Sequence, residues 1–224
     1  MSVIALLGDE SGHISHRELN ALRPRLRVEL GVESEWVPTD AGADLTAYDG
    51  IWLVPGSPYA DDAAVYRAIG LARQRDIPFL GTCGGMQYAV IELARTVLGL
   101  TGADHAESDG ESDSNVVVPA ACSLYGEERL VTPVPGSRFA ELVAEPFVGM
   151  HYCSFLAAPD VVEKLVAAGA VVGATAEDAG VEVLEWPANR FFMVSMFQPH
   201  IGASTGAPVH PLVAAFVAAV QARV

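Results

Sequence analysis

The sequence predicts an α/β fold in which helices cover both faces of a central, mostly parallel β-sheet. In the N-terminal half, short apolar runs ended by Gly, Pro or acidic residues alternate with longer segments of helical periodicity. The apolar runs are continuous, which is typical of parallel strands that are buried on both faces. The 224 residues are expected to form one domain, 1–224, large enough to bury a sizeable core.

Each element of the N-terminal half follows from these patterns. The apolar run at 3–10 predicts a buried strand, and 15–30 predicts a helix with Ser15 as N-cap and leucines at helical spacing. The segment 61–76 has acids at its start and arginines at its end, which matches the dipole of a helix. Further strands are expected at 31–38, 48–59 and 77–85, and further helices at 61–76 and 86–100.

The C-terminal half is more mixed. Residues 103–114 form an acidic, polar segment and predict a loop. Two apolar stretches, 114–126 and 128–136, predict strands of a smaller antiparallel piece. The other expected elements are a helix at 159–169, strands at 180–187 and 191–200 around a turn, and a closing helix at 209–224.

Charge and hydropathy exclude some classes of partner. The formal net charge is −15, so DNA and anionic membrane surfaces would be repelled and are not expected partners. No window reaches the about 18 uninterrupted apolar residues of a membrane helix, and the N-terminus lacks the basic region of a signal peptide. We therefore expect a cytoplasmic protein.

The cysteines and histidines do not form a metal-binding pattern. Cys83, Cys122 and Cys153 are too few and too widely spaced for a disulfide framework or a redox CxxC pair. Free thiols in a reducing compartment are expected. Since no zinc-ligand spacing occurs, neither a metal nor a cofactor is expected.

The stretch "GTCGG" places Cys83 between a strand and a helix. A nucleophile on such a turn lies above the sheet edge, and the helix N-terminus beneath it favours the thiolate. The N–H of Gly84 would then face a developing oxyanion, with a second donor from the Gly56–Ser57 turn. The alternative is that Cys83 is a small buried residue in a glycine-rich turn.

Three segments together resemble a known family. "YDGIWLVPGSPY", "DIPFLGTCGGMQYAVIELARTVLGL" and "FFMVSMFQPH" are similar to class I glutamine amidotransferases, above all to the C-terminal glutaminase domain of CTP synthase and to free-standing proteins related to it. The similarity covers nearly the whole chain. It implies a flavodoxin-like three-layer sandwich.

The resemblance also implies roles for single residues. Cys83 corresponds to the nucleophile that forms a glutamyl thioester, and Gly56 and Gly84 to the oxyanion-hole turns. Gln87 corresponds to the glutamine after the nucleophile turn, and Glu107 to an acid that helps to hold the substrate amino acid.

Two departures from the family pattern argue against ordinary glutamine hydrolysis. The family ends its catalytic strand in F-H-P-E, with His as base and Glu as its partner, whereas this chain has Gln198-Pro199-His200. A glutamine amide cannot accept and return a proton near pH 7, so it cannot act as the base. At 152–155 the chain also lacks the arginine that holds the glutamine carboxylate in the family. The amidoligase domain and a Walker-type phosphate loop are expected to be missing too.

Several residues are candidates to replace the missing base or to add a second thiol. His200, His151 or His16 are candidates for the base, and Cys153 for a second thiol in the pocket. His13 and His16 follow the first strand, at the expected carboxyl edge of the sheet. The alternatives are histidines outside the site and a packed, unreactive cysteine.

Three functions therefore remain open. The first is a thiol-dependent enzyme that acts on a small metabolite through Cys83. The second is a glutaminase subunit that serves a synthetase in trans, and the third is a non-catalytic metabolite-binding protein. The expected partners are a small-molecule substrate, a synthetase in the second case, and a second copy of the chain if it is a homodimer.

Overall fold

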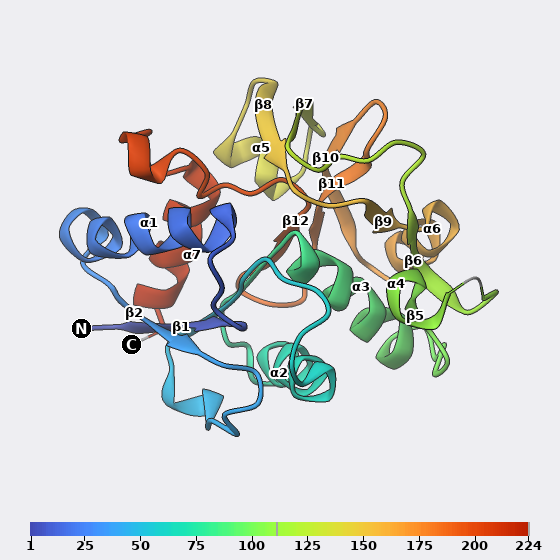
Figure 1. Cartoon of the computed structure of the whole chain (residues 1–224), viewed down its shortest axis with the longest axis horizontal. Helices are drawn as coiled ribbons and strands as arrows, with labels where there is room; N and C mark the ends of the chain where they lie inside the picture. The colour runs from blue at the N-terminus through green and yellow to red at the C-terminus, as the bar shows by residue number, and fades with distance from the viewer. Residues whose placement is uncertain (111, 224) are drawn as a thin grey trace.

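A nine-stranded sheet forms the centre of the computed structural model, which describes residues 1–110 and 112–223 (Figure 1). The strand order is β2-β1-β3-β4-β12-β11-β10-β7-β8. The strands are β1 (Val3–Leu7), β2 (Glu33–Val37), β3 (Gly50–Leu53), β4 (Phe79–Thr82), β7 (Glu127–Pro133), β8 (Phe147–His151), β10 (Val171–Ala176), β11 (Gly180–Glu185) and β12 (Phe192–Ser195).

The first five strands in this order are parallel, as expected. Their order, β2-β1-β3-β4-β12, is that of a flavodoxin-like sheet. In such a sheet the connections from β1 and β3 leave toward opposite faces, and a crevice opens at the carboxyl ends of these strands. This edge is where the sequence predicted the site.

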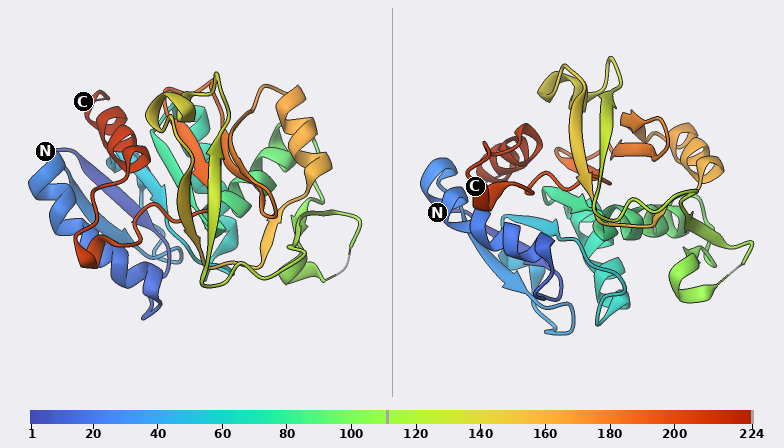
Figure 2. Two further views of the ribbon diagram at one scale, coloured as in Figure 1. Left: turned by 90° about the horizontal axis from the view of Figure 1, so that it is seen from above. Right: turned by 45° about the horizontal axis from the view of Figure 1, so that its top comes forward.

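Helices cover both faces of the parallel strands (Figure 2). Ile4 and Leu6 of β1 pack with the helices α1 and α7, whereas Ala5 and Leu7 pack with α2 and α3. All four side chains are buried, which explains why the strand reads as one continuous apolar run. The long helices are α1 (Ile14–Leu30), α2 (Asp62–Arg75), α3 (Gly84–Thr96), α6 (Pro159–Ala167) and α7 (Pro211–Gln221).

The C-terminal half differs from the prediction in its details. The two strands expected in a separate antiparallel sheet belong to different sheets. The strand β7 extends the main sheet, and β6 pairs with β5 and β9 in a small second sheet. The predicted acidic loop contains a short strand and a helical turn, and its Glu111 lies outside the described residues. The additional short elements are β5 (Asp104–His105), β6 (Asn115–Pro119), β9 (Phe155–Ala157), α4 (Ala106–Asp109), α5 (Arg138–Leu142) and two 3₁₀ turns, Leu45–Ala47 and Ala203–Thr205.

The N-cap of α1 also differs from the predicted one. The N-cap is His13, whose Nδ1 accepts the N–H of Ser15 at 3.2 Å. Ser15 is buried in the first turn, so its hydroxyl is not the cap. Within residues 1–110 and 112–223, no helix has the length and apolar character needed to span a membrane.

Candidate active site

Cys83 occupies a tight turn between β4 and α3. Its backbone has φ 54° and ψ −112°, a conformation that non-glycine residues rarely adopt. The turn is held from both sides: the Cys83 N–H donates to the Ser195 carbonyl at 2.8 Å, and the Cys83 carbonyl accepts from Met86 N–H at 2.9 Å. The backbone conformation expected for a nucleophile on a strand-to-helix turn is therefore present.

The neighbouring turn after β3 lies directly against this one. A Cβ atom on Gly84 would collide with the Gly56 carbonyl oxygen, so only glycine fits at position 84. Neither the Gly56 nor the Gly84 N–H donates to a backbone carbonyl within the described chain. Both groups are thus available as donors beside Cys83, as an oxyanion site requires.

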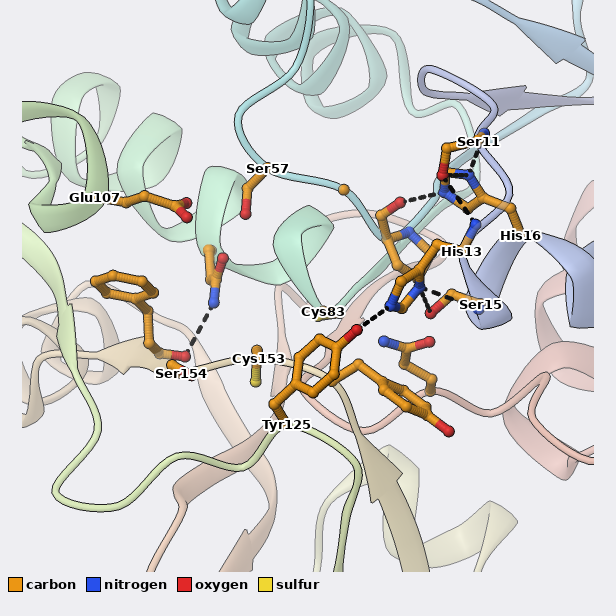
Figure 3. Close-up of a pocket in the computed structure, with 16 residues that line it drawn as sticks. Ser11, His13, Ser15, His16, Ser57, Cys83, Glu107, Tyr125, Cys153 and Ser154 are labelled. Carbon is orange, nitrogen blue, oxygen red and sulfur yellow. Dashed lines mark hydrogen bonds between the residues drawn. The ribbon is translucent and has the colours of Figure 1, made fainter.

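A cavity of about 380 Å³ opens beside Cys83 at the carboxyl ends of β1, β3 and β4 (Figure 3). It brings together most of the residues singled out in the sequence. The lining residues are Ser11, His13, Ser15, His16, Pro55, Gly56, Ser57, Cys83, Gln87, Glu107, Tyr125, Tyr152, Cys153, Ser154, Phe155 and Gln198. Among these described lining residues there is no lysine or arginine, and the only carboxylate is that of Glu107.

Cys153 is in contact with Cys83 inside this cavity. The neighbouring Cys153 thiol is the largest influence on the pKa of Cys83 and lowers it below the ordinary value. The Gln198 amide, the Gly84 N–H and the charge of His151 act in the same direction, against the effect of burial. The Cys83 sulfur and burial in turn raise the pKa of Cys153. Cys83 is thus the more acidic thiol of the pair.

Gln198, which the resemblance places at the position of a base, lines the cavity. Its side chain is 3% exposed, and neither amide atom has a nitrogen or oxygen partner among the described residues. The amide also helps to lower the pKa of Cys83. An amide here can donate a hydrogen bond but cannot carry a proton.

His200 does not reach the cavity, and its placement argues against the predicted role as base. It is 2% exposed and packs edge-on against Trp52, with ring centroids 5.8 Å apart. Both ring nitrogens lack partners in the described chain, and burial lowers the pKa of His200 to about 3. His200 therefore stays neutral behind the site.

His16 lines the cavity, but both of its nitrogens are used. Its Nε2–H donates to the Pro55 carbonyl at 2.6 Å, and its Nδ1 accepts the Ser11 N–H at 2.8 Å. These bonds fix the neutral tautomer, so His16 orders the loop after β1 and has no lone pair left for a substrate proton.

His151 has the partner that a base requires. Its Nε2 lies 2.9 Å from each carboxylate oxygen of Glu182, and both side chains are completely buried. Burial lowers the pKa of His151, but the hydrogen bond and charge of Glu182 outweigh it, so that the pKa is raised. His151 is not part of the cavity wall, yet it is close enough for its charge to lower the pKa of Cys83.

Three aromatic rings form the wall on the side of α1. His13 donates from Nε2 to the Tyr125 hydroxyl at 2.9 Å, and its ring packs edge-on against Tyr152 at 5.4 Å. Tyr125 and Tyr152 pack against each other at 5.6 Å. Tyr152 belongs to the segment 152–155, in which the resemblance implied an arginine, and it contributes an aromatic ring to the cavity wall.

The opposite end of the cavity is built around Gln87. Its amide donates to the Phe155 carbonyl at 2.9 Å and accepts from His105 Nε2 at 3.2 Å. The Nδ1 of His105 accepts the Glu107 N–H at 3.0 Å, which fixes the tautomer. Gln87 therefore joins α3 to the second sheet, and Glu107 lies on the rim with its carboxylate free to meet a ligand.

The sequence analysis missed Glu182 and Tyr125. Glu182 is one of two buried acids, with Glu185, in the otherwise apolar strand β11, and an acid among apolar strand residues could have indicated a buried polar contact. Tyr125 lies in a loop and is 59% exposed, so nothing in its sequence neighbourhood indicated its contact with His13.

The family is decided by comparison with known sequences. The family model "Glutamine amidotransferase class-I" matches residues 19–183. The chain belongs to the class I glutamine amidotransferase family. The resemblance inferred from its motifs is thereby confirmed.

Curated relatives of this amidotransferase-family chain include CTP synthases. The CTP synthase of Natronomonas pharaonis is 35% identical over 185 residues, covering 78% of this chain and 34% of that protein. The CTP synthase of Trichormus variabilis is 35% identical over 204 residues, covering 86% of this chain and 37% of that protein. The chain thus spans about a third of the length of the curated relatives it matches.

Solved structures confirm the fold of this family member. The glutaminase domain of CTPS from Trypanosoma brucei, with bound acivicin, superposes with a TM-score of 0.86 at 24% identity, covering 99% of this chain and 94% of that one. A glutamine amidotransferase from Thermotoga maritima gives a TM-score of 0.63 at 15% identity, covering 91% of this chain and 78% of that one.

Proposed function

We propose that this protein is a thiol-dependent enzyme that acts on the carbonyl group of a small metabolite other than glutamine. The observation that carries the proposal is Cys83, a cysteine with a lowered pKa on a tight turn, facing a cavity. A structural cysteine would favour the thiol form and an ordinary backbone conformation. Cys83 has neither property.

The proposed reaction is acyl transfer. The Cys83 thiolate attacks the carbonyl carbon, and the Gly84 and Gly56 N–H groups stabilise the oxyanion. The bond to the amine, alcohol or thiol leaving group then breaks, and water hydrolyses the thioester. His151, with Glu182 behind it, acts through its charge on the thiolate, in place of the base that Gln198 replaces.

The cavity disfavours an amino acid substrate such as glutamine. An α-carboxylate entering it would meet Glu107 and a wall of neutral side chains, with no lysine or arginine among the described lining residues. The net charge of −15 adds to this repulsion. A neutral or amine-bearing substrate with an apolar part suits Tyr125, Tyr152 and Phe155 better.

Acylation by a small generic ester tests the proposal. Incubation with p-nitrophenyl acetate should release a burst of nitrophenol, and peptide mapping should locate the acetyl group on Cys83. Cys122→Ala, which removes an exposed thiol, should keep the burst, and Cys83→Ala should lose it. Acetylation of Cys122 with Cys83 unmodified would refute the proposal.

A glutaminase that supplies ammonia to a synthetase in trans is the second candidate. It is favoured by the family and by His151 with Glu182, a histidine–carboxylate pair near Cys83. Acivicin separates the two candidates, because it is an amino acid analogue. Rapid labelling of Cys83 by acivicin would support the glutaminase, whereas labelling by iodoacetamide alone would support the first proposal.

A further inference from the structure

Two of the three cysteines of the chain share the cavity, and this pairing is independent of any acyl-transfer chemistry. Cys83 comes from the turn before α3 and Cys153 from the segment between β8 and β9, so the fold brings together two distant parts of the sequence. Both side chains line the same cavity, and each has the largest influence on the pKa of the other. The third, Cys122, is exposed and does not line the cavity.

The two thiols are chemically unequal. The pKa of Cys83 is lowered by Cys153 and by the donors around it, whereas the pKa of Cys153 is raised. One thiolate that can attack and one adjacent thiol that can resolve the product are the two components of a reversible dithiol centre. An acyl-transfer site requires only the first of them.

The cavity also gives an oxidant access to the thiolate. Cys83 is 6% and Cys153 8% exposed, and both line the same space of about 380 Å³. Gln198 is a buried amide without a nitrogen or oxygen partner in the described chain, and it faces this space. Its N–H can donate to a peroxide oxygen beside the Cys83 sulfur.

We propose that Cys83 and Cys153 form a redox-active dithiol that reduces a small hydroperoxide and closes to an intramolecular disulfide. The Cys83 thiolate attacks the terminal oxygen of ROOH: the S–O bond forms, the O–O bond breaks, and the leaving alkoxide takes a proton to give ROH. Cys83 is then a sulfenic acid. The Cys153 sulfur attacks the Cys83 sulfur, the S–S bond forms, and the hydroxyl leaves with the Cys153 proton as water.

The electrons and atoms of this sequence balance. The two sulfurs together lose two electrons, which reduce the peroxide O–O bond, and the products are one disulfide, ROH and water. The two sulfurs must approach to about 2.05 Å to form the bond. An external thiol restores the dithiol by exchange. In the disulfide form Cys83 has no thiolate, so the proposed acyl-transfer reaction stops.

Titration with hydrogen peroxide tests the proposal in a Cys122→Ser background, which removes intermolecular disulfides. One equivalent of peroxide should consume both remaining thiols, and mass spectrometry of the unreduced digest should find the Cys83 and Cys153 peptides joined. Dithiothreitol should restore both thiols. In Cys122→Ser/Cys153→Ser, Cys83 should instead accumulate as a sulfenic acid that dimedone traps.

Two results would contradict the dithiol. Persistence of both thiols, or oxidation of Cys83 to a sulfinic acid while Cys153 stays a thiol in the Cys122→Ser protein, would overturn the proposal. Iodoacetamide labelling before oxidation separates the dithiol from the acyl-transfer enzyme. A reactive Cys83 that forms no disulfide refutes only the dithiol, whereas an unreactive Cys83 refutes the thiol-dependent enzyme as well.

Discussion

The Nε2 atom of His151 lies 2.9 Å from both carboxylate oxygens of Glu182, and neither side chain is exposed. A buried carboxylate in this position favours the protonated imidazole. The charge of His151 in turn lowers the pKa of Cys83. Glu182 thus influences the thiol through His151.

Glu182→Gln should therefore raise the pKa of Cys83. We expect the midpoint of its alkylation rate against pH to move upward by on the order of one pH unit. Glu185→Gln is the matched control, because Glu185 is another buried acid of β11 that binds the N–H groups of Arg138 and Phe139 instead. Equal profiles for the two variants would exclude Glu182 from the site.

Cys83 should be the cysteine that iodoacetamide alkylates first at neutral pH. Its burial slows access, but its pKa is lowered, whereas that of Cys153 is raised, and a lower pKa provides more of the reactive thiolate. Mass-spectrometric mapping of native protein measures the order. Cys83→Ala should abolish the activity and keep the circular dichroism spectrum. Earlier labelling of either other cysteine would favour a non-catalytic binding protein.

Ammonia release from glutamine should be weak or absent for the purified protein. Loss of the base in such a site lowers turnover by about 10³-fold or more, and the cavity contains no cationic clamp among its described residues. Gln198→His alone should not restore full activity, because His200 replaces the orienting acid and Tyr152 the arginine. A coupled glutamate dehydrogenase assay measures this, with an ordinary class I amidotransferase as reference. Comparable rates would contradict the prediction.

His200 should make folding stability depend on pH below neutrality. Its pKa is lowered to about 3 by burial, so between about pH 6.5 and pH 3 the unfolded chain binds a proton that the folded one does not. Stability therefore falls with pH in this window, by about 2 kcal/mol from this residue at pH 5. His200→Phe removes the titration and should flatten the dependence.

Urea unfolding at pH 7 and pH 5 measures this difference. In His200→Phe the phenyl ring keeps the contact with Trp52, and the two ring nitrogens that have no partner in the described chain are absent. The variant should thus lose less stability than the original protein between the two pH values. An unchanged loss would assign the acid sensitivity to other groups.

The parallel half of the fold could be predicted because it is encoded locally. Each of its strands is a continuous apolar run, and the tight turn at Cys83 follows from small residues at a strand end. In the second half α6, β11, β12 and α7 were also predicted, but β8, β9 and β10 were not, because they are partly exposed strands whose sequences do not alternate between apolar and polar residues. Their place in the sheets depends on partners that are distant in sequence.

The site was predictable to the same extent. Cys83 and Gly56 were predicted from the turns at one sheet edge, Gln198 and Cys153 from the family resemblance, and all four line the cavity. His200 does not line the cavity, because the backbone after β12 places its side chain behind Gln198, against Trp52. Spacing along the sequence gives the edge on which a residue lies, but not which side of the turn its side chain occupies.

The hydrogen bond between His13 and Tyr125 has a consequence for biosynthesis. It joins residues 112 positions apart, so the aromatic wall cannot form until the second half of the chain has left the ribosome. The β-α units from β1 to α3 leave the ribosome first, whereas the Cys83 turn is completed only by Ser195 at the end of β12. A nascent chain thus carries an uncovered thiol for a time. Pulse labelling of Cys83 during translation would measure the chain length at which the completed wall protects the thiol.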